Sequence, residues 1–408
     1  MQKPSPASSG KPELLFLSPE PPYPMIGGGA TRTASLLEFF APRFAIDLIL
    51  FAEEGSPDPA DAVSRHLVRS VSTLRLPRHD KTVLARTTRN LVRYLQSRPP
   101  LIDRFSGFHE PLSTWLAGRR YALGIVEHFW CAPYVSLLRR HCADVWLDLH
   151  NIESVWYARL AKTENFFLRP ALTGFGSVCR KLECELLPRF SRILVPSETD
   201  LQELGTAAGT VPVTVYPNAL PWIDPPERSG EEAIIFTGNL EYAPNVRAIC
   251  WFSRHVWPWL SRWRPGLVWR IVGKNPHGIR HCIKWDRGIE LIGPVENAIT
   301  EIARVQVAVV PVFAGSGTRF KIIEAWAAGT PVVSTTIGAE GLGAEDRRNI
   351  VIADSARDMK EKIAGLLDSV ELRAEVSAGG RRMYDERFTW QVVWRSLERS
   401  GVLDSNVG

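Results

Sequence analysis

A glycine-rich turn with charged neighbours is the clearest candidate for chemistry in this sequence. The turn contains Gly315 and Gly317, and it follows an apolar run from Val307 to Val312. Glycines let the backbone approach a ligand closely, and the free N–H groups at the start of a following helix favour an anion. Arg319 and Lys321 add positive charge beside the turn. These residue types suit the binding of a phosphate group.

Glu324 extends the pattern beyond a simple phosphate site. A carboxylate can hold two hydroxyls of a ribose in a bidentate grip. Its position shortly after the turn therefore suits a nucleotide diphosphate that bears a sugar. The alternative is an ordinary strand-to-helix turn with one or two solvated basic residues, and a bare Gly-x-Gly pattern would favour that alternative.

The elements that must position these residues form a strand–helix–strand unit. The apolar run at 307–312 has the composition of a buried parallel strand, and the segment after the turn is a helix rich in Ile, Ala and Trp. Pro331 and the β-branched run from Val332 to Thr336 begin a second strand. The turn then lies at the carboxyl edge of a sheet, where ligands of open α/β folds bind.

The whole stretch at 315–342, GSGTRFKIIEAWAAGTPVVSTTIGAEGL, resembles the donor-binding signature of family 4 of the retaining glycosyltransferases, in its bacterial polysaccharide-assembly branch. In that family the second Glu of an E-x7-E pattern holds the nucleotide ribose, and Glu324 occupies its place. Ser316 stands where the first Glu would be. The sugar contacts of that Glu must then come from the backbone N–H groups of Gly317 and Thr318 or from elsewhere. We count Ser316, Gly317 and Thr318 among the donor-binding residues.

The resemblance implies an α/β chain with the GT-B fold, in which two Rossmann-like domains face each other across a deep cleft. A length of 408 residues suits two domains. The segment at 218–232 is rich in Pro, Gly and charge, as linkers are. We predict a disordered segment at 1–12, an acceptor-side domain at 13–222, a nucleotide-sugar-binding domain at 223–385, and a helix at 386–408 that crosses back to the first domain.

Two further pairs of glycines follow predicted strands. Gly28 and Gly29 come after a first strand at Glu13–Ser18, and Gly238 and Gly273 end two strands of the second domain. In a GT-B enzyme these loops face the cleft, so the resemblance implies that all four glycines contact the donor. A plain loop with a helix cap is the alternative for Gly28 and Gly29.

His150 is the candidate catalytic histidine. It ends the predicted strand Val145–His150, and a histidine where a strand meets its loop can orient or deprotonate a substrate hydroxyl. The block DLHNIES around it resembles the segment in which family 4 enzymes carry a cleft histidine near the transferred sugar. A capping or core histidine is the alternative. His128 is another strand-end candidate of the same type, and Glu153 is a weaker companion of His150. Arg32, on the first turn of the helix after Gly28 and Gly29, is a lesser candidate for a residue that faces the cleft.

The loop after the first strand of the second domain departs from the family pattern. Most family 4 enzymes place an Arg and a Lys there to neutralise the donor diphosphate, whereas this sequence has Asn239 and Asn245. A diphosphate leaving group needs cationic or N–H stabilisation as charge develops on it. We therefore assign Arg319 and Lys321 to that charge and count them, with His150, as the catalytic residues.

Composition argues against a metal or a cofactor. The six cysteines have no C-x-x-C spacing, which disfavours zinc and redox motifs and favours reduced, mostly structural thiols. No Asp-x-Asp pair lies at a predicted strand end. We therefore expect no metal site and no cofactor, and we treat the nucleotide sugar as the donor substrate. A net charge of +5 suits an anionic partner and does not require nucleic acid.

The sequence predicts a cytoplasmic protein, with a peripheral location on the inner face of the plasma membrane as an open option. Its polar, Pro- and Ser-rich start is unlike a secretory signal, and no apolar run is long enough to span a bilayer. Arg86, Arg89 and Arg93 are spaced to fall along one side of a helix. Such a patch would meet anionic lipid, with a solvated helix face as the alternative.

The function implied is that of a retaining glycosyltransferase that moves a sugar from a nucleotide-diphosphate sugar to a hydroxyl of a glycan or a polyprenyl-linked glycan, in exopolysaccharide or cell-surface polysaccharide biosynthesis. Two alternatives stay open. One is a non-hydrolysing sugar-nucleotide epimerase, which shares the fold and needs no acceptor. The other is a noncatalytic protein with a degenerate donor site. Ser316 in place of the first Glu, and the absence of the family's Arg/Lys pair, are the reasons to consider it.

Overall fold

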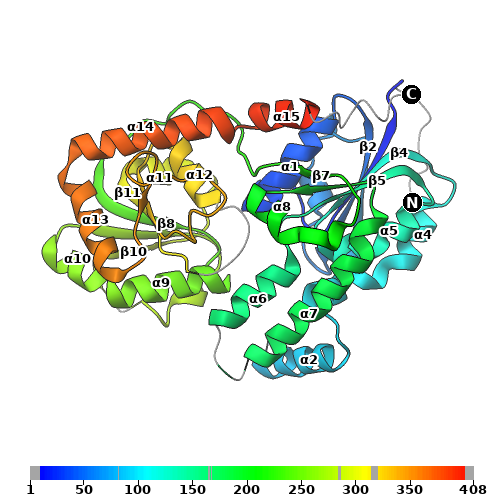
Figure 1. Ribbon diagram of the computed structural model, residues 1–408, viewed down its shortest axis with the longest axis horizontal. Coiled ribbons are helices and arrows are strands. Elements are labelled where there is room, and N and C mark those ends of the chain that lie inside the picture. The colour runs from blue at the N-terminus through cyan, green and yellow to red at the C-terminus, as the bar shows by residue number, and fades with distance from the viewer. Residues whose placement is uncertain are drawn as a thin grey trace. The chain divides into compact units, whose positions relative to one another are not determined.

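The computed structural model describes residues 10–80, 82–163, 166, 168–283, 286–313 and 320–399. The chain divides into two compact units (Figure 1). Among the described residues, the first comprises residues 10–216 and 397–399, and the second comprises residues within Pro217–Ser396. The division lies next to the Pro- and Gly-rich segment that begins at Asn218.

The first unit is built on a parallel sheet of seven strands in the order β3-β2-β1-β4-β5-β6-β7. Apolar runs form the central strands, which is typical of parallel sheets covered on both faces. Phe16 of β1 pairs with Leu48 of β2 on one side and with Ile125 of β4 on the other, so the strand order reverses between β1 and β4. The strands are β1 (Glu13–Ser18), β2 (Ala45–Glu53), β3 (Ser70–Leu76), β4 (Tyr121–Glu127), β5 (Cys142–Asp148), β6 (Arg192–Val195) and β7 (Val213–Val215).

Helices cover both faces of this sheet. Leu15 and Leu17 of β1 point into a core shared with α3, α4, α5 and α7, while Phe40 of α1 packs edge-on against Trp146 of β5. Ser197 caps α8 by accepting from the Asp200 N–H at 3.1 Å. The helices are α1 (Gly28–Phe40), α2 (Val83–Leu95), α3 (Pro100–Phe105), α4 (His109–Leu116), α5 (Val135–Leu138), α6 (Glu153–Thr163), α7 (Arg169–Leu186) and α8 (Glu198–Leu204).

The second unit has a parallel sheet of six strands in the order β10-β9-β8-β11-β12-β13. Its helices α9 and α10 lie on one side of the sheet and α11 and α12 on the other (Figure 1). The strands are β8 (Glu231–Thr237), β9 (Val268–Val272), β10 (Ile289–Ile292), β11 (Val305–Val310), β12 (Val332–Ser334) and β13 (Val351–Ile352). The helices are α9 (Ala243–His255), α10 (Trp257–Trp263), α11 (Ala298–Arg304), α12 (Phe320–Ala327), α13 (Ala356–Asp368), α14 (Val370–Arg387) and α15 (Trp390–Arg399).

The predicted strand–helix–strand unit is confirmed as β11, α12 and β12, which ends at Ser334, two residues before the predicted limit at Thr336. Ala308 of β11 pairs with Val332 of β12 in parallel. Trp326 of α12 is buried and donates its indole N–H to the Asn349 carbonyl at 2.8 Å. An apolar strand and a helix with one buried face therefore anchor the turn between them.

The expectation of reduced thiols is wrong for one pair of cysteines. Cys250 of α9 and Cys282, which follows the short 3-10 helix η6 (Pro276–Ile279), form a disulfide. The fold brings them together across 32 residues, a separation that no local motif reveals. The free cysteines are Cys131, Cys142, Cys179 and Cys184, of which only Cys184 is exposed.

Helices long and apolar enough to cross a membrane are absent from the described ranges.

Candidate functional site

In the first unit, the predicted residues gather where the strand order reverses. Ligands of open α/β sheets bind outside the carboxyl ends of the strands at such a point. Gly28 and Gly29 form the first turn of α1, which follows the loop after β1. A Cβ atom at Gly29 would collide with the Glu20 carboxylate and lie 3.6 Å from His128 Nε2. A larger residue at position 29 would have to displace the Glu20 carboxylate, which is the end of a flexible side chain.

His150 contacts two carboxylates that end neighbouring strands. Its Nε2 lies 2.6 Å from Oε2 of Glu127, the last residue of β4, and 3.4 Å from Oδ2 of Asp148, the last residue of β5. Both carboxylates are fully buried, and the His150 side chain is 9% exposed. Burial, and then the charge of Asp148, raise the pKa of Glu127 well above its ordinary value. Glu127 therefore favours the neutral form unless a cation faces it.

Asp148 is held ionised by a buried arginine. Arg32 of α1 donates from Nε to Asp148 Oδ2 at 2.7 Å and from Nη1 to the Tyr216 carbonyl at 2.6 Å. Burial opposes the charge of Asp148, but the Arg32 charge and the hydrogen bonds from His150 and Arg32 prevail and lower its pKa to about 2. Arg32 is 1% exposed, so the prediction that it lies open to a cleft is wrong. Its role is to hold the carboxylate that faces His150.

His128 adds a second imidazole to this cluster. Its ring stacks on His150 with centroids 3.5 Å apart and on Trp130 with centroids 4.1 Å apart. Burial, and then the nearby His150, lower the pKa of His128, which favours its neutral form. Its Nε2 lies 3.7 Å from Glu20 Oε2. The stack fixes the plane of His150.

Glu153 belongs to the supporting structure of this cluster. Its carboxylate accepts from the Trp130 indole N–H at 2.8 Å and from the Asn151 amide at 3.0 Å. Burial raises its pKa, and these two hydrogen bonds oppose the rise. Glu153 thus positions Trp130, which in turn packs on His128.

The cluster leaves one nitrogen of His150 for a substrate. Because Glu127 and Asp148 both face Nε2, Nδ1 is the nitrogen that a ligand would meet. An imidazole oriented in this way can orient a hydroxyl or take its proton. Ligand atoms of Glu127, Asp148 and His150 also lie within 4.8 Å of one another, as in a metal site. An ion there would compete with the Arg32 guanidinium, which already binds both oxygens of Asp148.

In the second unit the strand order reverses between β8 and β11. Gly238 follows β8 and Gly273 follows β9, and a Cβ atom at Gly273 would overlap the Gly238 carbonyl. The two loops therefore require glycine at 273 in order to pack. A Cβ atom at Gly238 would lie 2.8 Å from Asn245 Nδ2 and 3.2 Å from Lys321 Nζ. Gly238 thus leaves room beside an amide and an ammonium group.

Lys321 and Asn245 form a polar pair at this edge. Lys321 Nζ donates to Asn245 Oδ1 at 2.8 Å, and Asn245 Nδ2 donates to the Asn239 carbonyl at 2.9 Å. The ammonium also lies 4.0 Å from the centroid of the Phe236 ring, where a cation is attracted to the ring face. These contacts fix the charge of Lys321 next to Gly238.

Glu324 lies one turn beyond Lys321 on α12 and faces the end of β8. The Thr237 hydroxyl hydrogen-bonds to it, and Lys321 lies close enough to act on its charge. Burial raises the pKa of Glu324, while Lys321 and Thr237 oppose the rise. The carboxylate is therefore positioned on both sides before any ligand binds.

Four predicted site residues, Ser316, Gly317, Thr318 and Arg319, lie outside the described residues. Among the others, the structure brings Gly29 and His150 into the cluster of the first unit, and Gly238, Lys321 and Glu324 together in the second. Sequence reasoning did not assign roles to Glu127 or Thr237. Both are the last residue of a central strand, and that position was the available signal.

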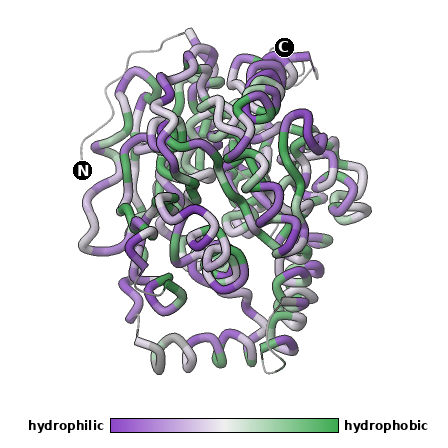
Figure 2. The backbone as a smooth tube through the Cα atoms, turned by 90° about the vertical axis from the view of Figure 1, so that its left-hand side faces the viewer, coloured by the Kyte–Doolittle hydropathy of each residue, from purple (hydrophilic) through white to green (hydrophobic). Residues whose placement is uncertain are grey.

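The predicted arginine patch on α2 is wrong in part. Arg93 is turned inward and binds Asp103 at 2.8 Å, and Arg89 donates to the Asp80 carbonyl at 3.3 Å. The Arg86 side chain lies outside the described residues. Large apolar side chains are among the exposed ones on α2, with Leu95 74% exposed and Leu91 57% exposed. Figure 2 shows hydrophilic and hydrophobic residues alternating along α2, the helix at the bottom of the view.

Comparison with known proteins concerns the fold of the chain and part of its second unit. Residues 231–369 match the family model described as glycosyl transferases group 1. The structure is similar to that of sucrose-phosphate synthase from Thermosynechococcus elongatus, with a TM-score of 0.70 and 15% identity over 96% of this chain and 98% of that one. It is also similar to HepE from Anabaena in complex with UDP and glucose, with a TM-score of 0.64 and 14% identity over 96% and 100% of the two chains.

A curated relative is an uncharacterized 44.6 kDa protein in the cps region of Klebsiella pneumoniae, which is 21% identical over 266 residues. The match spans 62% of this chain and 66% of that protein. The two parallel sheets and the similar solved structures define a protein of the GT-B class. Within the second unit, residues 231–369 match the glycosyl transferases group 1 domain.

Proposed function

We propose that this protein is a glycosyltransferase that transfers a sugar from a UDP-sugar, with retention of configuration, to a hydroxyl of a glycan or lipid-linked glycan. The observation that carries the proposal is the fixed pair of Lys321 and Asn245 beside Gly238, with Glu324 one turn further along α12. An ammonium, an open glycine and a carboxylate at a strand-order reversal suit a diphosphate and a ribose. The complex of HepE with UDP and glucose supports uracil as the base.

Lys321 would stabilise the diphosphate as the leaving group develops charge. A preorganised cation helps most when charge appears in the transition state, because it needs no rearrangement at that moment. The contact with Asn245 holds the ammonium in place. Asn245 stands near the place where most enzymes of the resembling family carry an Arg and a Lys. Arg319 is assigned the same role from the sequence. Glu324 would take the ribose hydroxyls.

His150 would orient the transferred sugar or the acceptor through Nδ1. Glu127 and Asp148 hold its ring from the other side, and His128 stacks on it. In the retaining reaction that the resemblance implies, an oxygen of the donor diphosphate accepts the proton of the acceptor hydroxyl. Transfer would then need no metal ion or other cofactor, because Lys321 and backbone N–H groups serve the phosphates.

A role in polysaccharide assembly is part of the proposal. The relative in the Klebsiella pneumoniae cps region supports it. The acceptor would be a growing glycan on a lipid carrier, at the cytoplasmic face of the membrane. The exposed Leu91 and Leu95 of α2, and Phe166 between α6 and α7, which is 80% exposed, suit contact with lipid.

The first experiment is a thermal unfolding series with UDP, GDP, ADP and their sugar conjugates, because a ligand of the native state raises the melting temperature. UDP compounds should give the largest shift. Acceptor-dependent release of UDP then tests transfer, and the anomeric configuration of the product tests retention. An isomerised nucleotide sugar formed without acceptor would favour the epimerase alternative. Donor binding without release under any acceptor would favour a degenerate site.

A further inference from the structure

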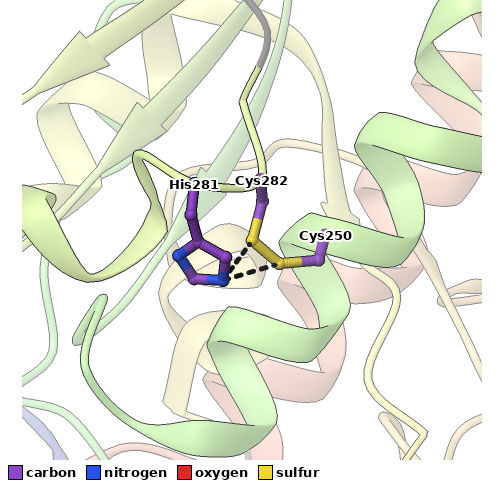
Figure 3. Close-up of side chains that lie close together, drawn as sticks. All are labelled: Cys250, His281 and Cys282. Atoms are coloured by element: carbon purple, nitrogen blue, oxygen red, sulfur yellow. Dashed lines mark hydrogen bonds between the residues drawn. A yellow bond between two sulfur atoms is a disulfide. The ribbon is translucent and has the colours of Figure 1, made fainter.

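Two cysteines and a histidine of the second unit lie together on its surface. Cys250 lies on α9, whereas His281 and Cys282 follow η6. His281 Nε2 lies 3.1 Å from Cys282 Sγ and 3.8 Å from Cys250 Sγ, and all three ligand atoms lie within 4.8 Å of one another. Figure 3 shows the imidazole edge facing both sulfur atoms. Nothing in the proposed transfer reaction uses these side chains.

We propose that the reduced form of these three residues binds a zinc ion. Thiolate and imidazole are the ligands that zinc prefers in proteins. At zinc–sulfur distances of about 2.3 Å and a zinc–nitrogen distance of about 2.0 Å, tetrahedral ligands lie roughly 3.5 to 3.8 Å apart. The present nitrogen–sulfur distances of 3.1 and 3.8 Å bracket that range. Three protein ligands leave a fourth position for water.

The disulfide and the zinc ion are alternative states of the same two sulfur atoms. A dithiol reductant must first open the disulfide, giving two thiols and the oxidised reductant. Zinc then binds as the two thiols lose their protons, and His281 donates the lone pair of Nε2. Cys250 and Cys282 are partly exposed and His281 is exposed, so both reductant and metal can reach the site.

A zinc ion at this site would link two segments of the second unit. The Ser253 hydroxyl already donates to the Cys282 carbonyl at 3.1 Å, which holds the segment after η6 against α9. A bound ion would join the same two segments through side chains as well. α9 also carries Asn245, the partner of Lys321. The proposal nevertheless stands apart from the transfer reaction, because metal binding can be measured without donor or acceptor.

The test is cobalt binding by the full-length protein, reduced with a phosphine and freed of metal by a chelator. Co²⁺ replaces zinc and gives thiolate-to-metal absorption bands when sulfur coordinates it. One equivalent should bind to the wild-type protein, and Zn²⁺ should displace it. Cys250→Ser and Cys282→Ser should each abolish the bands. Cys184→Ser, which removes an exposed free thiol elsewhere, is the matched control and should leave them unchanged.

His281→Asn separates a metal site from a plain disulfide. This variant keeps both cysteines, so it should still form the disulfide, as measured by alkylation and mass spectrometry. Its affinity for Co²⁺ should fall by at least the roughly 10- to 100-fold that the loss of an outer partner costs a metal site. Absence of thiolate–cobalt bands in the reduced wild-type protein would overturn the proposal. Unchanged cobalt affinity in His281→Asn would overturn it as well.

Discussion

His150 Nε2 lies 2.6 Å from Glu127 Oε2, and this contact joins the ends of two strands that neighbour each other in the sheet but are separated along the chain by a helix-bearing loop. The carboxylate fixes which edge of the imidazole, the one that carries Nε2, is turned inward. The chemistry proposed for His150 therefore depends on a residue that would not touch the substrate.

Replacing Glu127 tests this dependence. We expect His150→Asn to lower kcat by roughly 100-fold, within the range for a positioned acid–base group, and Glu127→Gln to lower it by a smaller factor. KM for the UDP-sugar should change less than kcat in both variants, because Lys321 and Glu324, which would bind the diphosphate and the ribose, lie in the other unit. Steady-state release of UDP provides both constants. Glu110→Gln, at an exposed position of the same unit, is the control. Equal kcat in Glu127→Gln and the wild type would contradict the role of Glu127.

The buried pair of Arg32 and Asp148 predicts a large loss of stability on truncation. Arg32→Met leaves Asp148 as an uncompensated buried charge, so the free energy of unfolding should fall by about 3 to 5 kcal/mol. Denaturant unfolding measures the change. Arg32→Met combined with Asp148→Leu should recover much of the loss, because it removes both charges. Arg140→Met, at an exposed position, should change stability by less than about 0.5 kcal/mol. A loss in Arg32→Met no larger than this control would refute the pairing.

The same cluster predicts opposite pH effects from two carboxylates. The pKa of Asp148 is lowered to about 2 in the folded protein, against about 3.9 in an unfolded chain. Its contribution to stability is therefore present above about pH 4 and is lost as the pH falls toward 2. The pKa of Glu127 is raised, so its contribution is present at low pH and is lost as the pH rises through its folded value.

Unfolding free energies measured across pH for Asp148→Asn and Glu127→Gln separate the two effects. Asp148→Asn should show a weaker loss of stability than the wild type between about pH 4 and 2. Glu127→Gln should lose less stability than the wild type as the pH rises above about 4.3. Parallel curves for all three proteins would show that neither carboxylate changes its pKa on folding.

Glu324 should contribute to nucleotide affinity. If its carboxylate accepts charge-assisted hydrogen bonds from the ribose, Glu324→Ala should weaken UDP-sugar binding by about 1.5 to 3 kcal/mol. Isothermal titration calorimetry measures the change. Glu361→Ala, on the exposed side of α13, removes the same charge from the same unit and should have no effect. Affinity unchanged in Glu324→Ala would remove this residue from the proposed site.

The exposed apolar residues of α2 should support membrane binding. Leu91→Glu combined with Leu95→Glu places two charges where apolar side chains would enter the lipid, so flotation with vesicles containing anionic lipid should decrease. Val370→Glu, at an exposed apolar position of the second unit, is the control. If the wild-type protein does not float with vesicles of any composition, α2 is not a membrane surface.

Local patterns in the sequence predicted most of the fold that positions the site. The run at 307–312 and the helix after Phe320 form β11 and α12, because burial on both faces of a sheet demands continuous apolar strands. The same reasoning placed Lys321 and Glu324 at the start of that helix. It also placed His150 at the end of β5.

Only the tertiary structure decided which side chains meet. Glu127 and His150, Asn245 and Lys321, and Cys250 and Cys282 are separated by 23, 76 and 32 residues. Their contacts depend on which strands are neighbours and on which helix lies over which loop. Arg32 was misjudged for the same reason, since its partner Asp148 lies 116 residues away. Periodicity and turn residues act over a few positions, whereas a polar contact between strand ends is fixed only when the sheet has formed and water has been excluded.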